Sequence, residues 1–494
     1  MKKVSILLMA MLIIAAMPML SFADEAQFTK AEFLKGVLET AEIQIEELAD
    51  SESLDVIDKE YAPYLKAAYD RNIISKDIEF NAKDAITKEE AVIILVNVFG
   101  ERVKVKSITE DTINKELQFS DNAHIKSKQY ITYALKNDLI KENSKCFYAV
   151  MPLTKDMSKK MIAHAKKAHD EHFVRDGLEA EEILVLANKK LEEEKTYKAK
   201  GNMNMDMRVN VEGLPAEDES AKTLMEQGMN MNMLIDFDIQ AQNPDKVYMK
   251  QVTVSKSDMN ELESEENGEV YMDGAMMYQK NSLSGDKWIK NDMSSVFSKI
   301  QSLQGNNIQN MTQLTDQQLK FFKDYAGFGE DVKKDGKEYY VITLDLDKEA
   351  YKKFYEDYTK EIIDASINAS LEQKSDGKDL QLEEQAEIEM AKQFVSQMIN
   401  DMDMEISYSF YIDKKTKCYE SMDMNVSMYM NMDRIVQMMA QMSEEDTDIS
   451  NIKMEMVTNM KGQFKYSDFG KEVVFPEITK DDIFNMEDAA LPQN

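Results

Sequence analysis

Hydrophobic and polar positions follow two different periods on the two sides of about residue 200. From residue 24 to about residue 195, apolar residues recur three and four positions apart, as in segment 33–41, which is the spacing of an amphipathic helix. From about Tyr197, apolar and polar residues alternate, as in segments 202–211 and 229–239, which is typical of long half-buried strands. The pattern therefore predicts a mostly helical first region and a second region rich in strands.

The alternation returns near the end of the chain, in segments 422–432 and 452–460, and helical segments interrupt the strand region. The longest of these helical segments span about 348–371 and 382–402. Few strands are joined by crossover helices of the length that parallel pairing requires, so we expect a mainly antiparallel sheet with helices across one face. The predicted fold class is α+β.

The first 23 residues have the features of a secretory signal peptide. Lys2 and Lys3 precede an apolar run from Val4 to Leu20, and the following Ser21–Ala23 supplies the small residues of a cleavage site. A proline interrupts the apolar run, which favours cleavage over retention as a membrane anchor. No later apolar stretch is long enough to cross a bilayer. We therefore expect an exported protein with no transmembrane segment after signal cleavage.

Composition narrows the classes of partner and chemistry. The chain has 60 Lys and Arg against 92 Asp and Glu, a net charge of −32, which argues against nucleic-acid binding because that requires clustered cations. We expect Cys146 and Cys418 to be free thiols. His164, His169 and His172 share one helix, but their charged surroundings favour a solvated helix over a zinc site. Without a nucleophile elbow or a phosphate loop, we expect neither an enzyme nor a cofactor or metal.

A short motif occurs three times in the first region and opens an amphipathic helix each time. Its lysines are Lys30, Lys88 and Lys155, and each one directly follows a threonine that an apolar residue precedes. Threonine is a preferred N-cap, and carboxylates in the first turn of a helix are stabilising. Over about residues 24–168 these units resemble the S-layer homology repeat.

In the S-layer homology family, three such repeats form a three-pronged domain that binds secondary cell-wall polysaccharide non-covalently. Lys30, Lys88 and Lys155 replace the arginine usual in the family; they keep a cation for an acidic sugar but lose the bidentate fork. The resemblance implies that residues 24–170 bind wall glycan through these lysines. The Glu- and Lys-rich composition of residues 171–196 separately predicts an exposed, charged linker helix between the two regions. Alternatively, the motifs are only helix caps in a degenerate helical domain.

Methionine dominates the alternating segments, because 30 of the 38 methionines follow Gly201. Three interpretations compete. In the first, the methionine side is an ordinary sheet core, since the unbranched thioether fills irregular space; in the second, it lines a cavity for an acyl chain; in the third, it binds Cu(I). Copper is disfavoured because no His or Cys lies nearby. The predicted apolar-ligand lining comprises Met203, Met205, Met207, Met229, Met231, Met233, Met424, Met428, Met430, Met454 and Met456.

Short strings in the second region carry another resemblance. Segments 245–250, 269–280 and 411–417 resemble surface proteins of Gram-positive bacteria, which in turn are similar to the LolA and LppX lipoprotein carriers. In that group a curved antiparallel half-barrel wraps around helices and leaves an apolar cavity. The resemblance implies such a domain over residues 197–494, with helices on one face of the sheet.

Together these features predict a secreted, extracellular surface protein of Gram-positive type, associated with the cell wall or an S-layer. The helical repeats would hold wall polysaccharide, and the sheet domain would bind an apolar or lipid-like ligand. The alternative is a structural or adhesive surface protein whose sheet domain has a solid core and binds no small molecule.

Overall fold

The computed structural model describes most of the chain, in two compact units. The units are Met1–Gly177 and Leu178–Asn494. The predicted signal peptide, residues 1–23, lies outside the described residues. The described residues are 28–45, 59–75, 80–213, 228–258, 263–282, 284–294, 298, 321, 325–360, 363–364, 382–436 and 452–484.

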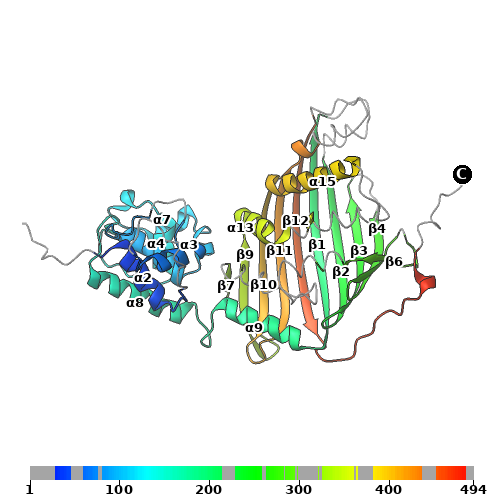
Figure 1. Ribbon diagram of the computed structural model, residues 1–494, viewed down its shortest axis with the longest axis horizontal. Helices are drawn as coiled ribbons and strands as arrows, with labels where there is room; N and C mark the ends of the chain where they lie inside the picture. Colours follow the sequence, from blue (N-terminus) through cyan, green and yellow to red (C-terminus); the bar gives the residue numbers. More distant parts are fainter. Residues whose placement is uncertain are drawn as a thin grey trace, which may run out of the picture. The chain divides into compact units, whose positions relative to one another are not determined.

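The described part of the first unit is built from helices, in agreement with the helical period of its sequence (Figure 1). The apolar positions of segment 33–41, Phe33 and Leu34 among them, are buried in a single core. The helices are α2 (Lys30–Thr40), α3 (Ala62–Asp70), α4 (Lys88–Phe99), α5 (Arg102–Val105), α6 (Glu110–Glu116), the 3-10 turn η1 (Asn122–His124), α7 (Lys128–Lys136) and α8 (Lys155–His172).

The residues that precede the three Thr-Lys motifs join in a closed ring of backbone hydrogen bonds. The amide of Phe28 donates to the carbonyl of Leu153 (3.2 Å), Leu153 donates to Ile86 (2.9 Å), and Ile86 donates back to Phe28 (3.0 Å). All three side chains are buried. Because each motif contributes one donor and one acceptor, the starts of α2, α4 and α8 are held together with three-fold pseudosymmetry.

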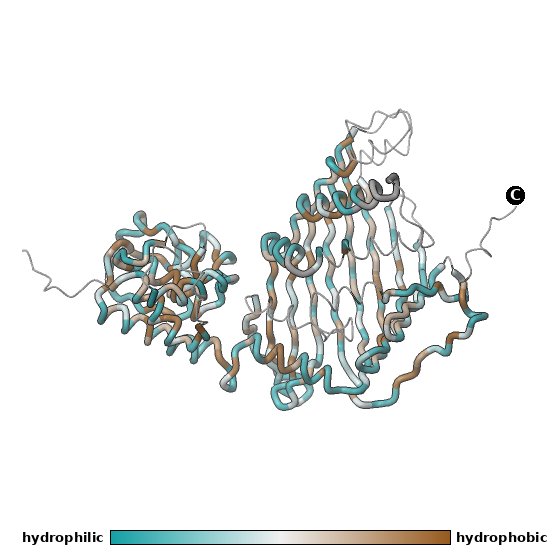
Figure 2. Tube along the Cα trace, viewed as in Figure 1, coloured by the Kyte–Doolittle hydropathy of each residue, from teal (hydrophilic) through white to brown (hydrophobic). Residues whose placement is uncertain are grey.

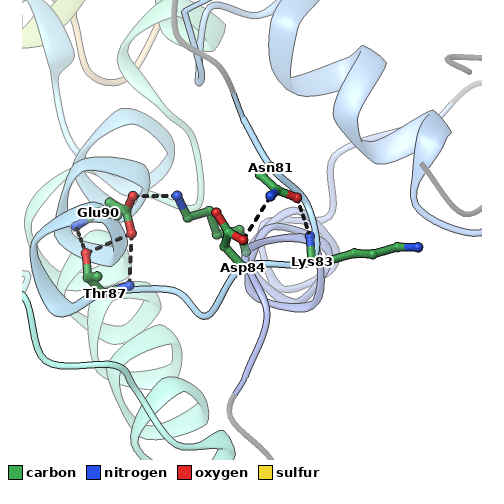
Figure 3. Close-up of polar contacts among 6 residues, drawn as sticks. Asn81, Lys83, Asp84, Thr87 and Glu90 are labelled. Atoms are coloured by element: carbon green, nitrogen blue, oxygen red, sulfur yellow. Dashed lines mark hydrogen bonds and ion pairs between the residues drawn. The ribbon is translucent and has the colours of Figure 1, made fainter. Parts of the chain in front are cut away.

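Each motif threonine caps its helix, as the sequence predicts. In α4 the Thr87 side chain accepts from the Glu90 amide, and the Glu90 carboxylate accepts from the Thr87 amide, which is a capping box (Figure 3). The other oxygen of Glu90 lies 2.7 Å from Nζ of Lys30, in the first repeat. Burial alone would raise the pKa of Glu90, but the hydrogen bonds from Lys30 and Thr87 outweigh it and lower the pKa.

The second unit contains a 12-stranded sheet in the order β6-β5-β4-β3-β2-β1-β12-β11-β10-β9-β7, with β8 beside β9. Neighbouring strands are antiparallel throughout, which confirms the predicted antiparallel sheet. Its closure into a half-barrel stays a prediction. The strands are β1 (Thr196–Glu212), β2 (Met229–Gln242), β3 (Lys246–Ser257), β4 (Glu263–Asp273), β5 (Met276–Lys280), β6 (Ile289–Asp292), β7 (Ala326–Phe328), β8 (Val332–Lys334), β9 (Lys337–Leu346), β10 (Met402–Asp413), β11 (Tyr419–Asn431) and β12 (Lys453–Ser467).

The helices of the second unit lie across this sheet (Figure 1). The predicted helix from residue 348 is observed as α13 (Lys348–Phe354), which continues into the π-helix η2 (Tyr355–Thr359). The predicted helix from residue 382 is α15 (Leu382–Asp401), which leads directly into β10. In the described residues α13 and α15 pack on the same side of the sheet as α9 (Ala180–Glu193).

The prediction of an exposed, charged linker helix over residues 171–196 is wrong for α9. Ile183, Leu184 and Leu191 are buried against the sheet, and the helix belongs to the second unit. With Ala180 and Ala187, which are also buried, these residues recur three or four positions apart along the helix. They form a continuous apolar stripe that the many Glu and Lys residues of the segment conceal in a composition count.

The segment after β12, which lies in the middle of the sheet, runs to the edge formed by β6 and pairs with Trp288, just before that strand (Figure 1). The Trp288 amide donates to the Asp482 carbonyl (2.7 Å), and the Phe484 amide donates to the Trp288 carbonyl (2.8 Å). Trp288 is 3% exposed and packs with Tyr248 and Tyr271. Trp288 therefore serves as a packing residue where the segment after β12 meets the sheet beside β6.

The ion pair between the first two repeats leads to a prediction for Glu90→Gln. Glutamine keeps the capping box but removes the charge, so the change should destabilise the first unit by about 1 kcal/mol at pH 7. The pKa of Glu90 is lowered from 4.5 in the folded state, so this contribution is present above pH 4.5 and is lost as the pH falls further. Hydrogen exchange of the α4 amides in the wild type and the variant, followed over this pH range, measures the loss of stability.

The exposed pair Lys167–Glu171 on α8 supplies the control for this experiment. Glu171→Gln should change the protection of the same amides by less than about 0.5 kcal/mol at any pH, because both side chains are solvated. A Glu90→Gln effect that does not decline at all as the pH falls below 4.5 would show that the charge is not responsible.

Candidate apolar-ligand face

Strand register places every predicted lining methionine on one side of the sheet. Directly paired residues of neighbouring strands point to the same side, and successive residues of a strand alternate. Met205 pairs with Met233 of β2 and with Met460 of β12, and Met428 of β11 pairs with Thr458 of β12. The predicted methionines of β1, β2, β11 and β12 therefore share a single surface.

We define the Met face as the side chains of β2, β1, β12, β11 and β10 that point to this side. These strands are consecutive in the sheet. The Met face contains Met229, Met231, Met233, Ile235, Phe237, Ile239 and Ala241 of β2; Tyr197, Ala199, Gly201, Met203, Met205, Met207, Val209 and Val211 of β1; Met454, Met456, Thr458, Met460, Gly462, Phe464 and Tyr466 of β12; Met422, Met424, Val426, Met428 and Met430 of β11; and Met402, Met404, Ile406, Tyr408, Phe410 and Ile412 of β10.

No charged residue belongs to the Met face, whereas the opposite side of the same strands is polar. The alternation is visible as brown and teal along the strands in Figure 2. On the polar side Asn232 donates to Asn204 (2.9 Å) and to Asp206 (2.7 Å), across adjacent strands. Because charged side chains are confined to the polar side, the sheet has one strongly apolar surface.

The apolar surface ends at β3 and β4. Outward from β2, Thr253 and Ser255 of β3 point to the same side of the sheet as the Met face. Their partners on the next strand, Glu266 and Ser264 of β4, point to that side as well. The hydroxyl oxygens of Ser255 and Ser264 lie 2.7 Å apart. Glu266 is exposed and is the charged residue nearest to the Met face on this side. The Met face thus has a polar border along one part of its edge.

Helices cover the two ends of the Met face. At one end α9 packs on Tyr197 and Tyr466. At the other end Ile399 of α15 packs with Met402 and Met430. Val436 covers the neighbouring end of β1 and β12. Between these coverings the methionines of β1 and β2 and Met424 of β11 are half-buried.

Two glycines lie in this middle region, on adjacent strands. A β-carbon at Gly201 would come within 2.4 Å of the Phe464 ring, which packs against Phe237 with ring centroids 5.7 Å apart. A β-carbon at Gly462 would have no neighbour closer than 3.5 Å. Gly201 is therefore required by the close approach of an aromatic ring, whereas a β-carbon at Gly462 would make only ordinary van der Waals contacts.

Thr458 is the one Met-face residue, within the described strands β2, β1, β12, β11 and β10, whose polar atom is both buried and unsatisfied. Thr458 is 5% exposed, and its Oγ1 has no hydrogen-bond partner among the described residues. A buried hydroxyl without a partner costs on the order of 1–3 kcal/mol. The sequence analysis missed Thr458 and the β10 methionines. The alternation of apolar and polar residues also runs through segments 402–412 and 454–464, and extending the predicted face along it would have included them.

The three motif lysines of the first unit have different surroundings. Lys30 pairs with Glu90, and its side chain is 15% exposed. Lys88 pairs with Glu142, is 12% exposed and lies over the Phe147 ring at 4.7 Å. Lys155 is exposed and has no ion-pair partner among the described residues.

The sequence explains why the two paired lysines differ. The second repeat has Glu90 at the third helical position, where it meets Lys30. The third repeat has Met157 at that position, so Lys88 pairs with Glu142 instead. Burial alone would raise the pKa of Glu142, but the bonds from Lys88 and Ser144 outweigh it and lower the pKa. Lys30 and Lys88 thus tie elements of the fold together.

A groove of about 410 Å³ lies between α2 and α8 in the first unit. Its lining combines the aromatic Tyr61 and the cations Lys35 and Lys159 with the carboxylates Glu32 and Glu39. Lys35 also pairs with Glu60 at 2.7 Å, which raises the pKa of Lys35. Lys155 lies four residues before Lys159 and so occupies the same face of α8, one turn away.

The candidate metal and thiol chemistry does not assemble in the described part of the chain. No group of three or more His, Cys, Asp or Glu side chains is arranged there to hold a metal ion. His169 lies between the rings of Phe99 and Phe173, and its Nδ1 is 2.9 Å from the Phe99 carbonyl. Cys146 and Cys418 are free thiols. None of the described helices combines the length and apolar character needed to span a membrane.

Comparison with known proteins gives remote structural neighbours. No family model matches the sequence, and no curated protein matches it. The crystal structure of LprF from Mycobacterium bovis is similar over 60% of this chain and 96% of that chain, with 12% identity and a TM-score of 0.24. The crystal structure of the Mycobacterium tuberculosis lipoprotein LppX is similar over 60% of this chain and 97% of that chain, with 9% identity and a TM-score of 0.23. At these values the likeness carries no conclusion about function.

The two glycines of the Met face lead to a matched pair of predictions. Gly201→Ala should destabilise the second unit by about 1–3 kcal/mol, because the new methyl group forces the Phe464 ring away from Phe237. Gly462→Ala should be neutral or stabilise by about 0.5 kcal/mol, because space is available and alanine has less backbone entropy to lose. Denaturant unfolding of the two variants measures both; equal effects would refute the assigned packing.

Proposed function

We propose that the second unit binds an apolar or lipid-like molecule against the Met face and acts as a carrier or binding module rather than as an enzyme. The observation that supports this best is the width of the charge-free surface. It extends over five adjacent strands, or about 20 Å, and its middle is half-buried rather than sealed by the described helices. An acyl chain fits such a surface without displacing any charge.

Thioether chemistry favours this use over an ordinary core. Methionine side chains are unbranched and polarisable, so they adapt to ligands of different shape. Each methylene that leaves water contributes about 0.8 kcal/mol, so ten of them supply on the order of 8 kcal/mol before the cost of association. A binding energy of this size corresponds to micromolar or tighter affinity only when association costs little. A surface largely formed before the ligand arrives meets that condition.

The polar border favours one orientation of a bound ligand. Thr253, Ser255 and Ser264 offer hydroxyl groups beside the methionines of β2. An amphiphile whose chain lies on the Met face would place its polar end at this border, where hydroxyl groups and water are both within reach. The proposed ligand is therefore an amphiphile rather than a pure hydrocarbon.

A pair of neighbouring residues on β1 tests the use of the Met face. Met205→Lys places a charge in the middle of this face, and we expect it to lower the uptake of a hydrophobic fluorescent dye at least tenfold. Asn204→Lys places the same charge on the polar side and should leave uptake unchanged. Native mass spectrometry of the wild-type chain should also show co-purified apolar adducts. Absence of both adducts and dye uptake would favour the structural or adhesive alternative.

We propose further that the protein is exported and associates with the cell wall or an S-layer through its first unit. Support comes from the three-fold arrangement of the Thr-Lys motifs around the backbone ring and from the groove, where Tyr61 and Lys159 lie alongside the carboxylates of Glu32 and Glu39. Lys155 and Lys159 are suited to an acidic polysaccharide, because cations at adjacent turns of α8 face the same way. Lys30 and Lys88 contribute to the fold instead, through Glu90 and Glu142.

Two lysine variants separate wall binding from stability. In the full-length chain, Lys155→Ala should reduce co-sedimentation with purified wall sacculi several-fold and leave thermal stability unchanged, because its side chain is exposed. Lys30→Ala should instead destabilise the first unit by about 1 kcal/mol through the loss of its ion pair. Sacculi stripped of polysaccharide should bind neither protein. Equal sedimentation with intact and stripped sacculi would refute wall binding.

A further inference from the structure

Thr458 lies at the centre of one row that crosses the Met face. Following the register from β10 to β3, the row contains Met404, Met428, Thr458, Met207, Met231 and Ser257. Along its own strand, Thr458 is flanked on the same side by Met456 and Met460. Its neighbours on this face are therefore methionines in all four directions.

This setting explains why the hydroxyl has no internal partner. A thioether sulfur has no hydrogen to donate and is only a weak acceptor, so the surrounding methionines cannot satisfy the hydroxyl. The residue is nevertheless 5% exposed, with Oγ1 unsatisfied among the described residues. A valine would occupy the same volume without the unsatisfied polar atom. The buried hydroxyl is thus an unused donor within the surface proposed to bind the ligand.

We propose that Thr458 donates a hydrogen bond to an uncharged oxygen of the ligand, the carbonyl of an acyl ester. This proposal rests on the proposed ligand-binding function of the Met face. The class of ligand follows from the surroundings: the Met face has no Lys or Arg, so a buried carboxylate or phosphate would lack a counter-charge. An ester carbonyl accepts one hydrogen bond and carries no charge, which matches a single hydroxyl among thioethers.

The position of Thr458 in the row also fits an ester with a polar end. Ser257, at the β3 end of the same row, is three strands away, or about 14 Å. A ligand whose carbonyl meets Thr458 therefore has Met207 and Met231 beneath it on the way to the polar border. Thr458 would act as a specificity-determining residue, because it distinguishes esters from chains of equal length that lack a carbonyl.

Two probes that differ only at the carbonyl test this role: 1-palmitoylglycerol, an ester, and 1-O-hexadecylglycerol, the ether of equal chain length. The wild-type chain should bind the ester about fivefold more tightly than the ether, as one neutral hydrogen bond predicts. Thr458→Val should bind both equally, with ether affinity unchanged or improved. Thr458→Ser, which keeps the hydroxyl, should retain the preference. Displacement of the hydrophobic dye measures all six affinities.

The outcomes separate this inference from the function on which it rests. If the wild type binds both probes and Thr458→Val keeps the same preference for the ester, Thr458 does not contact the carbonyl, and the Met face still binds apolar ligands. If the wild type binds neither probe and takes up no dye, the carrier function fails together with the role of Thr458. Wild-type binding of both probes with equal affinity overturns the inference alone.

Discussion

The register of the long antiparallel strands is the constraint on which the second unit depends. A shift of one residue in any pair would turn a strand's methionines to the polar side and its Asn and Asp residues to the apolar side. The pairing of Met205 with both Met233 and Met460 is therefore coupled to the hydrogen bonds of Asn232 on the opposite side. Apolar burial and polar satisfaction select the same alignment, and helices α9 and α15 can pack only on the surface that results.

The first unit depends on paired charges, whereas the Met face of the second unit excludes charge. The repeats of the first unit meet at a backbone ring in which Phe28, Ile86 and Leu153 exchange hydrogen bonds, and two of the three lysines next to that ring pair with carboxylates of another repeat. Where the third repeat has Met157 instead of a glutamate, Lys88 finds Glu142. The chain thus uses complementary charges to join short repeated pieces, and complete exclusion of charge to build one broad surface.

Periodicity was sufficient to predict the helical first region, the antiparallel sheet and the side on which the methionines lie, because a period of two fixes the side of every residue in a strand. It was insufficient for α9, where abundant Glu and Lys residues concealed a stripe of Ile183, Leu184 and Leu191. The ion pairs of Lys30 and Lys88 join residues that are 60 and 54 positions apart, and no local pattern identifies such partners. Thr458 also escaped notice, since a lone threonine in a strand is unremarkable until its neighbours are known.

The abundance of half-buried thioethers on the Met face has a chemical consequence. Oxidation converts a methionine sulfur into a sulfoxide, a polar group that accepts hydrogen bonds strongly. Leucine or isoleucine in the same rows would be inert to peroxide, so the choice of methionine makes the wettability of this surface depend on the oxidants around the protein. The adaptability that suits these side chains to varied molecules and their sensitivity to oxidation have the same origin, the exposed lone pairs of sulfur.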